Sequence, residues 1–232
     1  MPDIKIASLE GSEFNAYLAM PTVRRGHGLI VIQEIFGVNA AMRKLCDDFA
    51  AQGAIAFCPD LFWRQQPNVQ LTDRTPQEMK RASELLKGFD VEAAVRDLIS
   101  LLGHIRKMDE CNGKVGAVGY GLGGRLAYLL SARSDVDASV GYGATKLEKY
   151  LDEIHDIRTP LLLHLGALDP LTPADKFDKI LRSAARSPFI TAHIYENAGH
   201  DFALKDSQNY NEEAAKLADS RTKEFLAERL TI

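Results

Sequence analysis

Short apolar runs and longer segments of helical periodicity alternate along most of this chain. Two alternating stretches, 3–8 and 14–20, flank a Gly-Ser pair and predict an N-terminal hairpin. A continuous apolar run predicts a strand buried on both faces at 28–33, and a short buried strand is expected at 115–118. Further strands are predicted at 54–58, 138–142, 161–165 and 190–195. Capping residues and periodicity predict helices over 40–52, 76–87, 91–107, 125–132, 174–185 and 211–230. The polar stretch 61–74 lacks a clear period and is expected to be a loop.

The alternation of strand and helix from residue 28 onward decides the expected fold class. Parallel strands need crossover connections, so the pattern predicts an α/β protein with a mostly parallel, twisted sheet and helices on both faces. The 232 residues suit one large domain, 1–232, and the sequence shows no repeat, low-complexity tract or linker.

Composition narrows the expected partners and compartment. The net charge of −4 gives no reason to expect nucleic acid or an anionic membrane as a partner. The apolar runs are far shorter than the ~20 residues that span a bilayer, and the N-terminus shows no signal-peptide pattern. The cysteines Cys46, Cys58 and Cys111 are scattered and too few for a disulfide framework, so we expect a cytoplasmic protein.

The segment KVGAVGYGLGG, residues 114–124, combines a short apolar strand, a glycine-rich turn and the start of a helix. That order is typical of a nucleophile elbow, in which the middle residue of G-x-Nuc-x-G stands on a strained turn at the positive end of the helix. The flanking glycines leave room for a close crossing of strand and helix. Here the middle residue is Gly121, so the turn occupies a nucleophile's place without a nucleophilic side chain.

The same glycines superficially match a phosphate-binding loop. A dinucleotide-binding fold also requires an acid at the end of a neighbouring strand, but the next strand runs into Gly-Tyr-Gly at 141–143. We therefore expect no nucleotide and no other cofactor. No metal is expected either, because the histidines outside the motifs show no ligand spacing.

Residues with chemically active side chains follow several of the predicted strands. In open α/β sheets, ligands bind beyond the carboxyl ends of the strands, and Glu34, Gly121, Asp169 and His200 all lie just after strands. An elbow, then an acid, then a histidine is the chain order of the α/β-hydrolases. In that arrangement His200 takes a proton from the attacking group, while Asp169 fixes the imidazole tautomer and supports the imidazolium.

The chain resembles the dienelactone hydrolase family, the carboxymethylenebutenolidases. The matching segments are QEIFGVN at 33–39, GKVGAVGYGLGGRLAY at 113–128, ALDP at 167–170 and NAGHDF at 197–202, which together span nearly the whole chain. The resemblance implies an α/β-hydrolase fold, a monomer, and hydrolysis of a small lactone or ester by acyl transfer.

In that family a cysteine at the elbow attacks the substrate carbonyl. The resemblance places the roles of the catalytic histidine and aspartate on His200 and Asp169. It places the oxyanion-binding N–H groups on Ile35 and Leu122. It also carries over Glu34, which in the family helps to generate the thiolate.

The sequence departs from the family at positions that attack and bind the substrate. Gly121 replaces the cysteine, and Leu204 and Met79 stand where the family's enzymes for a carboxylated lactone have arginines. Lys80 and Arg81 are neighbouring cations that would have to substitute, but a shift of one position on a helix turns a side chain by ~100°. A carboxylated lactone is therefore not the expected substrate.

Three hypotheses remain for a small pocket walled by Glu34 and Phe36 on one side and His200 on another. The first is a hydrolase disabled by the loss of its nucleophile at Gly121, because an elbow without a side chain cannot form an acyl-enzyme. The second is a hydrolase in which His200 activates a water molecule. The third is a non-enzymatic protein that binds a small molecule in the retained pocket.

Overall fold

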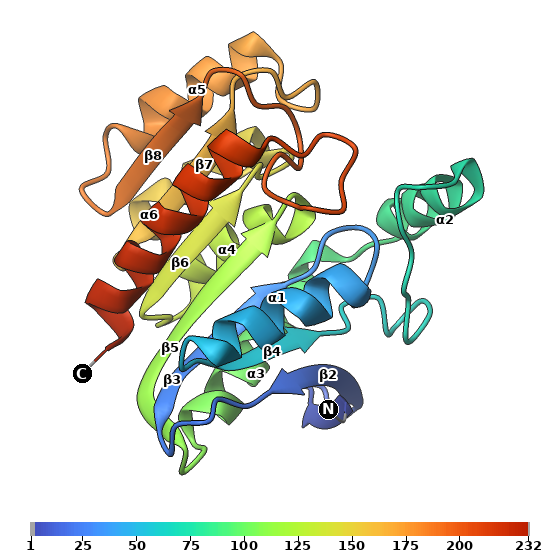
Figure 1. Ribbon diagram of the computed structural model, residues 1–232, viewed down its shortest axis with the longest axis vertical. Helices are drawn as coiled ribbons and strands as arrows, with labels where there is room; N and C mark the ends of the chain where they lie inside the picture. Colours follow the sequence, from blue (N-terminus) through green and yellow to red (C-terminus); the bar gives the residue numbers. More distant parts are fainter. Residues whose placement is uncertain (1–2, 232) are drawn as a thin grey trace. The chain divides into compact units, whose positions relative to one another are not determined.

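The computed structural model describes residues 3–231, which form two compact units (Figure 1). The first unit contains the chain up to Gly116 together with Thr231, and the second contains Ala117–Leu230. Strand β5, Cys111–Tyr120, belongs to both units because the boundary falls inside it. The strand order is β1-β2-β4-β3-β5 in the first unit and β5-β6-β7-β8 in the second.

The first unit is built on a mixed sheet. Besides β5, its strands are β1 Asp3–Ala7, β2 Glu13–Ala19, β3 Gly26–Ile32 and β4 Ile55–Pro59. The pairs β1–β2 and β2–β4 are antiparallel, whereas β3 and β4 run parallel. Strands β3 and β4 are buried along almost their whole length, which explains why their sequences are continuous apolar runs.

The helices of the first unit are α1 Ala40–Ala51, α2 Pro76–Lys87 and α3 Val91–Arg106. Each begins after a polar residue whose side chain accepts a backbone N–H of the first turn: Asn39, Thr75 and Asp90. Figure 1 shows α1 in front of β3 and β4 and α3 behind them, whereas α2 stands away from the strands. These capped starts are the ones that the sequence pattern predicts.

The second unit has an all-parallel set of strands after β5. They are β6 Ala138–Tyr142, β7 Leu161–Gly166 and β8 Ile190–Tyr195. The helices are α4 Leu122–Arg133, α5 Ala174–Ala184 and α6 Glu212–Leu230. Figure 1 shows α6 in front of β6 and β7, with α4 behind them. The sheet is therefore covered on both faces here, as expected for parallel strands.

The predicted order of strands and helices is confirmed, with the largest difference at the glycine-rich segment. The sequence predicts a strand that ends at Val118 and a helix that starts at Arg125. In the structure β5 continues to Tyr120 and α4 begins at Leu122, so Gly121 alone separates them. The other glycines lie inside regular elements, because they serve close packing and not a wide turn.

Two short 3₁₀ segments, Leu147–Lys149 and Leu151–Asp156, were not predicted, because single turns of helix carry no readable periodicity. None of the helices within residues 3–231 is long and apolar enough to cross a membrane. The organisation as a single domain, 1–232, stays a prediction.

Candidate active site

The elbow is a one-residue turn between strand β5 and helix α4. Gly121 has φ 52° and ψ −106°, a left-handed conformation that non-glycine residues rarely adopt. Its N–H donates to the Tyr142 carbonyl at 2.8 Å, and its carbonyl accepts the Thr145 N–H at 3.2 Å. Leu122 follows as the first residue of α4, so its N–H lies at the positive end of that helix. Gly121 therefore adopts freely a backbone geometry that would be strained for any residue with a side chain.

Two glycines flanking the elbow are required by close backbone contacts. A Cβ on Gly119 would lie 2.0 Å from the Gly123 carbonyl oxygen, and a Cβ on Gly124 would lie 2.7 Å from the Tyr142 carbonyl oxygen. Real Cβ atoms do not approach backbone this closely. The glycines thus allow α4 to start directly against β5 and β6, which fixes the position of residue 121.

Asp169 and His200 meet in the loops that follow β7 and β8. His200 Nδ1 lies 2.9 Å from Asp169 Oδ2, a hydrogen bond in which the ring N–H donates to the carboxylate. The Asp169 side chain is 3% exposed and the His200 side chain 12%. The second oxygen of Asp169 accepts the Leu171 N–H at 2.8 Å. Both carboxylate oxygens are therefore engaged, and the bond at Nδ1 orients the imidazole ring of His200.

The two loops are joined by their backbones as well. The Leu168 N–H donates to the Ala198 carbonyl at 2.9 Å. A Cβ on Gly166 would lie 2.6 Å from the carbonyl oxygens of both Ala198 and Gly199, so only glycine permits this approach. The loop bearing His200 is thus packed directly on the end of β7.

Gly143, just after β6, connects the elbow with the Asp169–His200 pair. Its φ is 51°, and a Cβ placed on it would lie 3.6 Å from His200 Nδ1 and 3.9 Å from Asp169 Oδ2. Its neighbour Tyr142 accepts the Gly121 N–H, as described above. One short segment therefore binds the turn through Tyr142 and leaves room beside the pair only for a small residue at position 143. The role of Gly143 is not readable from the sequence, because its only signal there is a glycine that follows a strand.

Glu34 and Ile35 lie in the first unit, directly after β3. The Glu34 side chain is buried, and Oε2 accepts the N–H of Ile35 at 2.7 Å. Gln33, fully buried, donates from Nε2 to the Glu34 carbonyl and accepts the Leu61 N–H at Oε1. The N–H that the family resemblance assigns to the oxyanion is therefore engaged by a neighbouring carboxylate.

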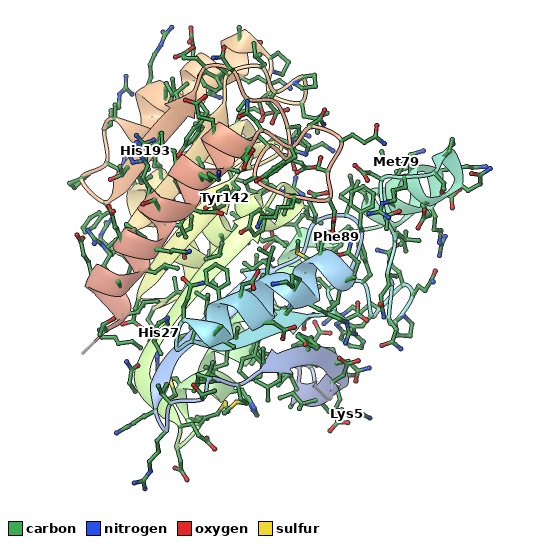
Figure 2. All side chains as sticks on the ribbon, viewed as in Figure 1. Lys5, His27, Met79, Phe89, Tyr142 and His193 are labelled. Atoms are coloured by element: carbon green, nitrogen blue, oxygen red, sulfur yellow. The ribbon has the colours of Figure 1, made fainter. Side chains whose placement is uncertain are left out.

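The residues expected to bind the substrate differ in their surroundings. Phe36 is half-buried, and its carbonyl accepts the Leu71 N–H at 2.8 Å. Lys80 and Arg81 are exposed on α2, where Arg81 pairs with Gln66 and with Glu84. Arg81 is thus engaged locally, on the same helix as Met79, which is 39% exposed (Figure 2). In the second unit, Leu204 is half-buried in the loop after His200.

Asp201 is a site residue that the sequence analysis did not single out. Its Oδ1 lies 3.4 Å from His200 Nε2, and its φ of 57° is left-handed. Asp201 stands inside the segment NAGHDF, but its placement depends on a backbone angle that the sequence does not display. Within residues 3–231, no three His, Cys, Asp or Glu side chains converge as a metal-binding group.

Comparison with known proteins identifies the family. The dienelactone hydrolase family matches residues 14–230. The carboxymethylenebutenolidase of Pseudomonas putida is 40% identical over 97% of this chain and 95% of its own length. A solved structure from Klebsiella pneumoniae, named "Putative Dienelactone Hydrolase", superimposes with a TM-score of 0.84 at 27% identity and 97% coverage of both chains.

A more distant similarity defines the fold. An α/β-hydrolase from Penicillium matches with a TM-score of 0.75 at 12% identity over 100% of this chain and 99% of its own. At that identity only the fold is shared. The strand order, the one-residue elbow and these matches lead to one conclusion. The chain has the α/β-hydrolase fold and belongs to the dienelactone hydrolase family.

Proposed function

We propose that this chain carries an acyl-transfer site for small neutral esters or lactones that lacks its attacking atom at Gly121. His200 is the proton-transfer residue, Asp169 orients it, and the Leu122 and Ile35 N–H groups are the oxyanion donors. Glu34 sets the ionisation of a nucleophile at position 121. A small-molecule ester or lactone is the partner, and the protein acts as a cytoplasmic monomer without a cofactor.

The observation that carries this proposal is the oriented Asp169–His200 pair in the same unit as the elbow. The 2.9 Å bond at Nδ1 leaves Nε2 as the nitrogen that exchanges a proton with a nucleophile. The retained φ of 52° at Gly121 supports the same interpretation. Glycine does not require a strained turn, yet the turn has the form that a nucleophile elbow needs.

The substrate's charge follows from the residues beside the site. Leu204, in the loop after His200, offers no cation, and Arg81 is already paired with Glu84 and Gln66. Asp201 adds a negative charge close to His200. A carboxylated substrate would meet repulsion from the Asp201 carboxylate, so neutral esters and lactones are preferred.

The test is the variant Gly121→Cys, assayed with small neutral aryl esters. A helix N-terminus and a neighbouring imidazolium lower a thiol's pKa from ~8.5 by several units, so the new cysteine is expected to be largely thiolate at neutral pH. Each oxyanion donor contributes on the order of 10²–10³ in rate. We expect saturable hydrolysis by the variant and rapid alkylation by iodoacetamide. The unaltered protein should show neither.

The matched control is Gly121→Ala, which adds the same Cβ at the same strained φ without a thiol. Its expected activity equals that of the unaltered chain, and circular dichroism checks that both variants fold. Adding His200→Ala to Gly121→Cys should abolish most of the gain. A folded Gly121→Cys variant with no hydrolysis and slow alkylation would overturn the proposal and favour a binding protein. Turnover of the unaltered chain at roughly 10 s⁻¹, the enzyme median, would instead favour a His200-activated water.

A further inference from the structure

His200 lies between two carboxylates, one at each ring nitrogen. Asp169 Oδ2 lies 2.9 Å from Nδ1, and Asp201 Oδ1 lies 3.4 Å from Nε2. In an acyl-transfer triad Nδ1 is the orienting nitrogen, and Nε2 accepts and returns the proton. The carboxylate of Asp201 therefore lies beside Nε2, the nitrogen that is expected to exchange a proton with the nucleophile.

The backbone around Asp201 fixes its side chain at this place. The φ of 57° lies in the left-handed region, which aspartate and asparagine enter more readily than other non-glycine residues. The next residue, Phe202, is 2% exposed, and its ring packs 4.9 Å from the ring of Tyr195. Its carbonyl accepts the Asn211 N–H at 2.9 Å. Because His200 and Phe202 are both anchored, the residue between them has little freedom to turn away.

The charges that face the ring favour its protonated form. Asp169 comes from the loop after β7 and Asp201 from the loop of His200 itself, while Gly143, at the end of β6, faces the ring and brings no charge. Glu34, in the first unit, is the other titratable residue that the family assigns to the site. The 3.4 Å separation at Nε2 exceeds the usual length of an N–H···O bond, so this interaction is mainly Coulombic. An opposite charge within ~4–6 Å raises the pKa of a histidine.

We propose that Asp201 is a positioning residue whose carboxylate, held beside Nε2, keeps the His200 ring protonated on both nitrogens in the resting protein. This inference rests on the proposed role of His200 as the base. A ring that already carries a proton on Nε2 accepts no second one, so base catalysis begins only as the pH rises through the pKa of His200. Asp201 moves that onset to higher pH, and removing its charge moves it to lower pH.

The first experiment needs no catalytic activity. Histidine ¹⁵N chemical shifts of the unaltered protein and of Asp201→Asn are followed against pH, with the His200 signals assigned from His200→Ala. Asparagine tolerates a positive φ, and Asp201→Gly serves as the second variant should Asp201→Asn not fold. We expect the pKa of His200 to fall by about one unit or more when the charge is removed. Asp178→Asn, which removes an exposed carboxylate paired with Arg182, is the matched control and should leave it unchanged.

The second experiment measures activity in a Gly121→Ser background, because a serine nucleophile needs a neutral imidazole as its base. Adding Asp201→Asn should move the onset of ester hydrolysis to lower pH by the same amount as in the titration, with KM unchanged. An unchanged His200 titration, or a fall in kcat at every pH without a shift of the profile, would overturn the proposal. If the serine variant shows no hydrolysis, the titration alone decides the role of Asp201, while the proposed function is judged separately from Gly121→Cys.

Discussion

A fully buried histidine, His164 on β7, makes the stability of the second unit depend on pH. Its Nδ1 lies 2.8 Å from the Tyr195 hydroxyl, and its Nε2 lies 3.0 Å from the Thr222 hydroxyl. Arg221 donates to the Tyr195 oxygen at 3.2 Å. The Tyr142 hydroxyl, at the end of β6 (Figure 2), lies 2.6 Å from Thr222. The histidine thus connects strands β6, β7 and β8 to helix α6.

These hydrogen bonds suit a neutral ring. Arg221 donates to the Tyr195 oxygen, and the hydroxyl proton of Tyr195 can then be donated to Nδ1 of His164. The ring proton then lies on Nε2 and is donated to Thr222. Protonation of Nδ1 would set two donors against each other. Burial first, and then the nearby positive charges of His193 and Arg221, lower the pKa of His164 from 6.5 to about 3.

The magnitude follows from this pKa difference. One pKa unit corresponds to about 1.4 kcal/mol, so the neutral form is favoured in the folded state by on the order of 5 kcal/mol. Above the unfolded pKa of 6.5 this contribution is fully present. As the pH falls below it, the unfolded chain binds a proton that the folded protein excludes, and stability is lost down to about pH 3. At about pH 5 the expected loss from His164 is about 2 kcal/mol.

The test is urea unfolding at neutral pH and at about pH 5, for the unaltered protein and for His164→Gln, which has a donor and an acceptor but does not titrate in this range. The variant is expected to be less stable at neutral pH, because its geometry fits the network less well, and to lose less stability on acidification. His155→Gln, at an exposed position, is the matched control and should keep the full acid sensitivity. An equal loss of stability in His164→Gln and in the unaltered protein would refute this reasoning.

Two further predictions concern α3. Asp97→Ala removes a buried carboxylate that accepts hydrogen bonds from the N–H groups of Trp63 and Arg64. The free energy of unfolding, measured by urea titration, should therefore fall by about 2 kcal/mol or more, and an unchanged value would contradict these contacts. Gly103→Ala should raise the free energy of unfolding by about 0.5–1 kcal/mol, because a Cβ at this helix position would meet no atom within 4 Å. The expected readout is a higher Tm, and a lower Tm would show that the position needs glycine.

The order of elements could be predicted from the sequence because each depends on local signals. Continuous apolar runs identified the strands buried on both faces, and residues such as Asn39, Thr75 and Asp90 identified where helices begin. The elbow was recognisable for the same reason, since close strand–helix crossing excludes side chains at Gly119 and Gly124. The chain order of elbow, acid and histidine predicted that Asp169 and His200 would meet.

The tertiary structure alone decided the contacts between segments that are far apart in the sequence. The position of Gly143 beside the His200 ring depends on how β6 ends near the loop after β8. The hydrogen bonds of His164 depend on how α6 lies on the sheet. Asp201 is adjacent to His200 in sequence, yet its approach to Nε2 follows from a positive φ fixed by the burial of Phe202. Local pattern determines which elements form, whereas hydrogen-bond direction and charge at the site arise only when distant elements pack together.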